Sequence, residues 1–154
     1  MTVLVGQRSF PTNQDKARWM LEQSLVDADL PAVRRWAVVF RRLPLEERPG
    51  AILRFVQWAI DYVRDPGQEV LEDAAVALLR GYGDCDAKSR AFVALCIASG
   101  IPARGLPVRV DQGFPHIEAE VFVGGRWVRA DPTILNSAIG QVPPASSAVT
   151  NYRP

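Results

Sequence analysis

Residues 83–104 have the sequence GDCDAKSRAFVALCIASGIPAR, and this stretch predicts the clearest helix in the chain. Asp84 is a favourable N-cap and Gly100 a favourable residue just beyond the end, so we expect a helix over about 84–99. Cys85 then falls in the first turn, where free backbone N–H groups and the positive end of the helix dipole favour a thiolate, the reactive form of cysteine. The apolar positions of this helix, which we expect in the core, are Phe92, Val93, Leu95, Cys96 and Ala98.

After this helix the apolar residues alternate with polar ones, a period of two that predicts β-strands. The expected strands span residues 105–111, 117–123 and 126–131. Gly124-Gly125 separates the last two strands and predicts a two-residue hairpin turn. The resulting register pairs residues of opposite charge, and aromatic residues, across the two strands: Glu120 with Arg129, and Phe122 with Trp127.

The hairpin register also brings a histidine and an aspartate together. His116, the only histidine, would lie opposite Thr133, which places Asp131 diagonally beside His116 on the same face of the sheet. A cysteine at a helix N-terminus, with a histidine and an aspartate on adjoining strands, is the arrangement that nucleophilic cysteine catalysis requires. The thiolate of Cys85 would attack an acyl carbon, the imidazole would carry the proton, and the carboxylate would fix the orientation of the ring.

The sequence before this region predicts four more helices, separated by proline and glycine. We expect them over residues 14–27 with Asn13 as the N-cap, from Pro31 onward, over 51–64 and over 70–79. The second helix would direct four residues inward: Val33, Trp36, Ala37 and Phe40. Its outer side would carry four arginines: Arg34, Arg35, Arg41 and Arg42. Three further aromatic residues are expected in the core: Trp58, Phe92 and Trp127. Because the helices precede antiparallel strands, we predict an α+β fold.

Length and composition predict one globular domain. A chain of 154 residues is close to the usual size of a single domain, and its 48% hydrophobic and 23% charged residues exclude a wholly disordered protein. We expect the domain over residues 1–138, with helices within 13–99 and strands within 105–131. An extended or flexible tail is expected over 139–154, where Pro, Ser and Thr are frequent.

Charge and residue counts exclude several classes of protein. The net charge of +1 provides no overall field for nucleic acid or an acidic membrane, and the arginines of the second helix are more simply a solvated face. No apolar run approaches the ~20 residues that span a bilayer, and the first residues lack a secretory signal, so we expect a cytoplasmic protein without a membrane partner. Two cysteines and one histidine are too few for the usual zinc site, and we expect neither a metal nor a cofactor.

Three motifs follow one another along the chain. They are Gly83-Asp-Cys-Asp86 with Gly100-Ile-Pro-Ala-Arg104, then His116-Ile-Glu-Ala-Glu-Val121, and then Gly124-Gly-Arg-Trp-Val128 with Asp131-Pro-Thr133. Together they resemble the transglutaminase-like superfamily over roughly residues 52–135. The resemblance implies a papain-like fold in which Cys85 is the nucleophile, His116 the general base and Asp131 the orienting residue. Compact members similar to this chain occur in bacteria, archaea and tailed phages, and many are proteases or have no assigned substrate.

The chain departs from the superfamily's pattern at two points. Glu118 stands two residues after the histidine, where members often have an aromatic residue. No side chain clearly matches the one that stabilises the oxyanion, and the candidates for oxyanion or substrate contacts are Tyr62, Trp58 and Asp84. The backbone N–H of Cys85 is the simpler oxyanion donor.

These observations predict a cysteine hydrolase that cleaves an amide bond through a thioester intermediate, either a peptidase or a peptidoglycan-type amidase. Its partner would be a protein or peptide substrate, including a peptidoglycan peptide. One alternative is a transglutaminase or acyltransferase with an amine acceptor. Another is a non-catalytic phage structural or assembly protein that retains the fold, docks through the 13–64 helices or the tail, and is virion-associated.

Overall fold

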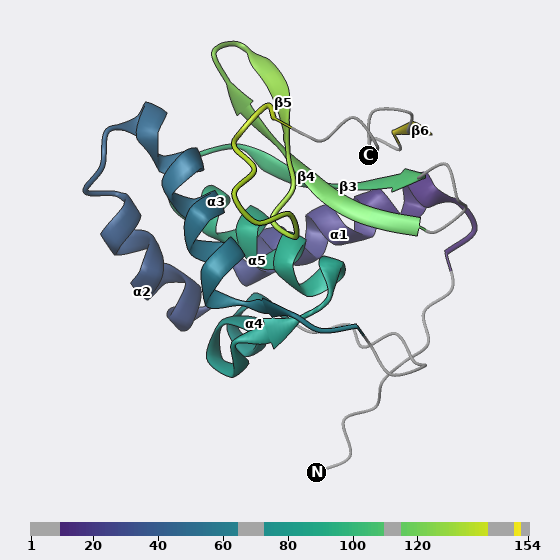
Figure 1. The fold of residues 1–154 in the computed structure, drawn as a ribbon, viewed down its shortest axis with the longest axis horizontal. Coiled ribbons are helices and arrows are strands. Elements are labelled where there is room, and N and C mark those ends of the chain that lie inside the picture. Colours follow the sequence, from purple (N-terminus) through teal and green to yellow (C-terminus); the bar gives the residue numbers. More distant parts are fainter. Residues whose placement is uncertain (1–9, 65–72, 110–114, 142–149, 152–154) are drawn as a thin grey trace.

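The computed structural model describes residues 10–64, 73–109, 115–141 and 150–151. Helices and strands follow the α+β order predicted from the sequence, and the last four strands form a small antiparallel sheet (Figure 1). The helical elements are α1 (Asn13–Asp27), α2 (Pro31–Phe40), the 3₁₀ turn η1 (Leu45–Glu47), α3 (Arg48–Ala59), α4 (Ala74–Arg80) and α5 (Cys85–Ala98). The strands are β1 (Asp61–Tyr62), β2 (Tyr82–Gly83), β3 (Ala103–Arg109), β4 (Pro115–Val123), β5 (Arg126–Ala130) and β6 (Thr150–Asn151).

Helix α5 forms the centre of the domain. Every residue from Ala87 to Cys96 on this helix is buried, and the helix packs against α1 to α4 as well as β3 and β4. Phe92 and Cys96 are fully buried, as expected from the sequence. Asp84 caps the helix by accepting a hydrogen bond from the N–H of Ala87, and Gly100, with a φ of +85°, follows its last turn. Both predicted ends of this helix are therefore confirmed.

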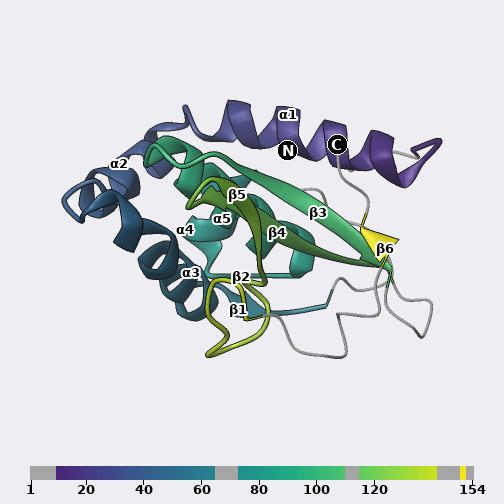
Figure 2. The ribbon, with the colours of Figure 1, turned by 90° about the horizontal axis from the view of Figure 1, so that it is seen from above.

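The main sheet has the strand order β5-β4-β3-β6, with antiparallel pairing throughout. Helix α1 runs alongside β3 and also packs on α5 (Figure 2). Gly105 permits this close approach, because a β-carbon there would lie 2.9 Å from the Cε of Met20. The hairpin turn at Gly124 and Gly125 has positive φ angles at both residues, as a type I′ turn requires. The predicted register is confirmed by two cross-strand pairs: Glu120 with Arg129, and Phe122 with Trp127.

The prediction that the third helix spans 51–64 is wrong at its C-terminal end. Helix α3 ends at Ala59, and Ile60 is extended. The chain then forms β1, which pairs in parallel with β2; the N–H of Asp61 donates to the carbonyl of Gly81, and that of Val63 to Gly83. The buried side chain of Ile60 continues the apolar pattern across the helix end, so periodicity alone did not reveal the change to a strand.

Other boundaries differ by a few residues. Thr12, rather than Asn13, caps α1, because its side chain accepts from the N–H of Asp15. Helix α4 begins at Ala74, after the cap Asp73; residues 70–72 of the predicted 70–79 helix lie outside the described part of the chain. Strand β3 begins two residues before the expected 105, whereas residues 110 and 111 are not described. Strand β5 ends at Ala130.

Three tryptophans that were expected in the core are partly exposed: Trp36 is 43%, Trp58 62% and Trp127 37% exposed. Trp36 packs against Phe55 with the two rings tilted by 42°, and Trp127 lies beneath the guanidinium of Arg104, whose Cζ is 3.9 Å from the ring centroid. Trp58 lies on α3 next to the buried Gln57, and consecutive helix positions face different directions. The other inward residues expected for α2, and its exposed arginines, are as predicted.

The segment expected as a tail contributes one described strand, since Thr150 and Asn151 pair with β3. Before it, the N–H of Gly140 donates to the carbonyl of Arg129 at 2.8 Å. Residues 142–149 and 152–154 lie outside the described part. Among the described helices, none is both long and apolar enough to cross a membrane.

Candidate active site

Cys85 is the first residue of α5 and is half-buried. The carboxylate of Asp84 accepts the N–H of Ala87 at 3.0 Å, which fixes the first turn of the helix. Gly83 lets the preceding strand approach this turn, because a β-carbon at Gly83 would lie only 2.6 Å from the β-carbon of Ala87. The β2–α5 turn therefore holds the thiol at the edge of the core.

His116 and Asp131 meet, as the hairpin register predicted. The Nε2 atom of His116 lies 2.7 Å from Oδ2 of Asp131. The β4–β5 ladder ends at the Ala119–Ala130 pair, and Asp131 follows directly, so the contact is made beyond the last paired residues. The other carboxylate oxygen, Oδ1, accepts hydrogen bonds from the backbone N–H of Thr133 at 2.9 Å and from its hydroxyl at 2.7 Å. Asp131 is 1% exposed, and its orientation is fixed by these three bonds.

Cys85 also interacts with the His116 ring and contributes to the shift of its pKa. Because Nε2 lies against Asp131, Nδ1 is the ring nitrogen left to interact with the thiol. Burial favours the neutral ring, but hydrogen bonds and charge interactions with Asp131 and Cys85 outweigh burial and raise the pKa of His116 to about 10. The ring is therefore protonated at neutral pH.

Burial alone would raise the pKa of Asp131. Hydrogen bonds from His116 and Thr133, together with the charge of the His116 ring, outweigh this effect and hold that pKa below its ordinary value. At neutral pH the pair is consequently an imidazolium and a carboxylate. An imidazolium in this position can both stabilise a thiolate and protonate a leaving group.

Glu118, the departure from the superfamily's usual aromatic residue, is fully buried beside this pair. Its Oε1 contacts the guanidinium of Arg129 on β5, and burial raises its pKa although Arg129 opposes the change. Further along the same face, Arg104 on β3 donates to Glu120 at 2.8 Å. Charged pairs thus line the sheet from the hairpin to the His116 end.

The three candidates for oxyanion or substrate contacts lie in different settings. Trp58 is 62% exposed on α3, and Tyr62 is 54% exposed on β1, whose partner strand leads into the Cys85 turn. Asp84 acts as the helix cap. None of the hydrogen bonds described for these side chains reaches Cys85.

Sequence reasoning missed a group of buried polar residues behind the thiol. The ammonium of Lys88, one turn after Cys85, donates to the carbonyl of Gln57 at 3.2 Å. The side-chain amide of Gln57 donates to the carbonyls of Ile134 at 2.9 Å and Ser137 at 3.0 Å. One available signal was that Lys88 is one of only two lysines in a chain with sixteen arginines.

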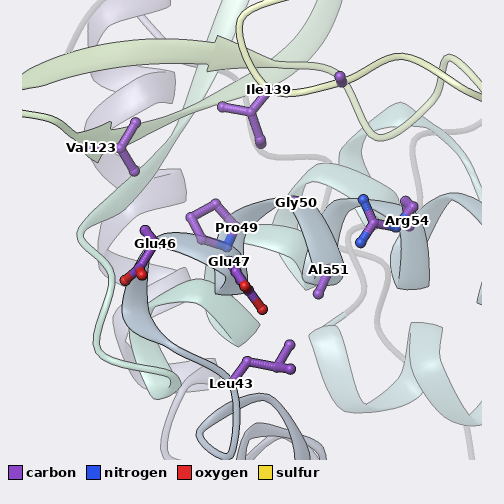
Figure 3. A pocket seen from close by; sticks show the side chains of 10 residues that line it. Leu43, Glu46, Glu47, Pro49, Gly50, Ala51, Arg54, Val123 and Ile139 are labelled. Carbon is purple, nitrogen blue, oxygen red and sulfur yellow. The ribbon is translucent and has the colours of Figure 1, made fainter.

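A separate pocket of about 470 Å³ lies at the far end of β4 from His116 (Figure 3). It is formed between the start of α3, Val123 and the loop at Ile139, with Glu46, Glu47 and Arg54 at its border. None of the residues that line it belongs to the Cys85, His116 and Asp131 group. Over the described residues, no group of three or more His, Cys, Asp or Glu side chains is arranged to hold a metal ion.

The family of the chain follows from a family-model match. The model described as the transglutaminase-like superfamily matches residues 39–132, a range that contains Cys85, His116 and Asp131. The chain belongs to the transglutaminase-like superfamily. The family resemblance of the three sequence motifs is therefore confirmed. A comparison with curated proteins gave no significant match.

Solved structures share the superfamily fold. A putative cysteine protease from Cytophaga hutchinsonii has a TM-score of 0.55 and 18% identity over 99% of this chain and 55% of its own. A putative protease from Parabacteroides distasonis has a TM-score of 0.61 and 13% identity, covering 87% of this chain and 32% of its own. A structure described as a TGase has a TM-score of 0.52 and 19% identity, covering 88% of this chain and 35% of its own. The chain thus spans about half, or less, of the length of these proteins.

Proposed function

We propose that this protein is a cysteine hydrolase that cleaves an amide bond in a peptide, either as a peptidase or as a peptidoglycan-type amidase. The observation that carries the proposal is the 2.7 Å contact between His116 and Asp131, in a ring whose pKa is also raised by Cys85 at the N-terminus of α5. Two findings support it: the chain belongs to the transglutaminase-like superfamily, and its fold is similar to that of a putative cysteine protease.

In the proposed reaction the Cys85 thiolate attacks the amide carbon and forms a C–S bond. The backbone N–H of Cys85 donates to the developing oxyanion. His116 then gives its proton to the departing nitrogen as the C–N bond breaks, which leaves a thioester and a free amine. Water next attacks the thioester while the neutral imidazole accepts a proton. The acid is released, and the thiolate–imidazolium pair is restored.

Asp131 has two tasks in this scheme. Its Oδ2 selects the tautomer of the ring that presents Nδ1 to the thiol, and its charge stabilises the imidazolium. Thr133 occupies Oδ1, so the carboxylate cannot rotate away without losing both bonds to that residue. These residues account for the formation of the acyl-enzyme, but they do not select between water and an amine as the acyl acceptor.

The test is covalent labelling followed by product analysis. Brief iodoacetamide treatment and peptide mapping should label Cys85 far faster than Cys96, whose burial raises its thiol pKa well above the ordinary value. Mass spectrometry with peptide amides and peptidoglycan peptides should then detect an acyl group on Cys85, absent in Cys85→Ala and retained in Cys96→Ala.

Adding a primary amine to the same experiment identifies the acyl acceptor. Release of the free acid supports the hydrolase, whereas exclusive formation of the new amide would identify a transferase. Equal labelling of both cysteines would contradict the proposed catalytic centre and favour the non-catalytic alternative.

A further inference from the structure

Gln57 is a buried residue of α3 whose side chain contacts the loop that follows β5. Its Nε2 donates to the backbone carbonyl of Ile134 at 2.9 Å, to that of Ser137 at 3.0 Å and to the Ser137 hydroxyl at 3.1 Å. Carbonyl oxygens only accept hydrogen bonds, so these contacts require the amide nitrogen to face the loop. Within the described part of the chain, every hydrogen bond between α3 and residues 131–137 comes from this one side chain.

The loop joins Gln57 to the carboxylate of the centre. The Ser137 hydroxyl that accepts from Gln57 also lies 3.1 Å from the carbonyl oxygen of Asp131. The side chain of Asp131 is in turn held at Oδ1 by Thr133 and contacts His116 through Oδ2 at 2.7 Å. Gln57 is therefore linked to the orienting carboxylate through one intermediate residue, by contacts of 3.1 Å at both steps.

The backbone of this loop has a conformation that needs support from outside. Asn136 has a φ of +65°, and among the described residues it is the only one other than glycine with a positive φ. An L-residue is less stable in this left-handed region than in the right-handed one, although asparagine tolerates it better than most residues. Asn136 lies between Ile134 and Ser137, so the Gln57 amide holds the loop on both sides of its strained residue.

Packing alone does not account for a glutamine at this position. Among the described residues, no hydrogen-bond partner is found for its buried amide oxygen Oε1, and burying such an atom is costly. Methionine would fill a similar space without this cost. The structure therefore uses the amide of Gln57 for its donors.

We propose that Gln57 is a positioning residue of this centre: its amide holds the 131–137 loop against α3 and thereby keeps the Asp131 carboxylate in contact with His116. The inference rests on the proposed function for its catalytic meaning, but the effect on His116 can be measured without any substrate. Gln57 is uncharged, so replacing it with another neutral residue removes no charge from the centre. The charged groups around Asp131 that stay in place are His116 and Glu118 on β4, Arg129 on β5 through its contact with Glu118, and Lys88 on α5.

The first experiment titrates His116, the single histidine, by NMR in wild type and Gln57→Met. Without the amide the carboxylate loses its fixed place against the ring, so the pKa of His116 should fall by on the order of one unit. Val56→Ala is the matched control, because it removes buried volume from the neighbouring residue of α3. It should lower the unfolding temperature but leave the pKa of His116 unchanged. An unchanged pKa in folded Gln57→Met, or an equal fall in Val56→Ala, overturns the proposal.

A second pair of variants decides the matter if Gln57→Met does not fold. Ser137→Ala removes the hydroxyl between Gln57 and Asp131, and it should lower the pKa of His116 by a smaller amount. Ser99→Ala is its matched control, because the Ser99 hydroxyl is buried beyond the end of α5 and has no hydrogen-bond partner among the described residues. Identical His116 titrations in the two serine variants overturn the proposal.

Failure of the proposed function is recognised separately. If wild-type Cys85 resists alkylation while the Gln57 or Ser137 substitution still lowers the pKa of His116, then the cysteine hydrolase is refuted and the positioning of Asp131 stands. If Cys85 is reactive and neither substitution moves that pKa, the hydrolase stands and the role of Gln57 is refuted.

Discussion

Replacing Asp131 with asparagine tests the centre most directly. The substitution preserves the shape of the side chain and its capacity to accept from Thr133, but it removes the charge 2.7 Å from the His116 ring. Asp131 and Cys85 each contribute a hydrogen bond and a charge that raise the pKa of His116 from 6.5 to about 10. If Asp131 supplies about half of this shift, the pKa of His116 in Asp131→Asn should fall to roughly 8.

The expected loss follows from that change. A fall of about two pKa units removes ~3 kcal/mol of stabilisation from the imidazolium. The corresponding substitution in a serine triad costs about 10⁴ in turnover, and a thiol needs less help than a hydroxyl, so we expect a loss of about 10–10³ in the acylation rate of Cys85. At about 1.36 kcal/mol for each tenfold change in rate, this loss corresponds to ~1.4–4 kcal/mol of activation free energy.

The pH dependence of stability has a definite sign. His116 has a higher pKa in the folded protein than its ordinary value, so its contribution is fully present below about pH 6.5 and is lost as the pH rises through about 10. Asp131→Asn should therefore destabilise the protein at pH 6, and the difference from wild type should shrink as the pH approaches 10. Chemical unfolding at both pH values measures this.

Titration of the single histidine by NMR gives the pKa without ambiguity, and circular dichroism checks the fold. Asp29→Asn, at an exposed aspartate before α2, is the matched control and should behave as wild type. If Asp131→Asn leaves both the His116 pKa and the alkylation rate unchanged, then Asp131 is only a residue at a strand end, and the proposed role is refuted.

The parts of the site that could be predicted depend on short-range signals. Asp84 and Gly100 mark the ends of α5, and their capping geometry is encoded within a few residues of each end. Gly124 and Gly125 determine the hairpin, and a two-residue turn fixes every pair on the two strands, including the approach of His116 to Asp131. No local rule relates α5 to β4, so Cys85 could be grouped with His116 and Asp131 only through the chemistry that the three side chains share and through the family resemblance.

The parts that could not be predicted depend on tertiary contacts. Helix α3 ends at Ala59 because β1 pairs with β2, whose residues lie 21 positions further along the sequence. The apolar pattern of the segment contains no sign of this pairing. The burial of Lys88 is likewise invisible to periodicity, since a lysine on a helix is ordinarily solvated. It becomes meaningful only when Gln57 and the Asp131 loop are seen beside it.

Two further substitutions separate the thiol from the turn that presents it. In Cys85→Ala the pKa of His116 should fall, because the ring loses the interactions with Cys85 that raise it; an unchanged NMR titration would mean that the two groups do not meet. Gly83→Ala should lower the free energy of unfolding by ~1–3 kcal/mol and slow alkylation of Cys85, because the new β-carbon would lie 2.6 Å from that of Ala87 and displace the first turn of α5. Gly50→Ala is the matched control: it lies inside α3, its β-carbon meets a neighbour only at 3.6 Å, and the better helix propensity of alanine should make it neutral or stabilising. Equal unfolding midpoints for the two glycine variants, with unchanged alkylation, would show that the close β2–α5 approach is not what positions the nucleophile.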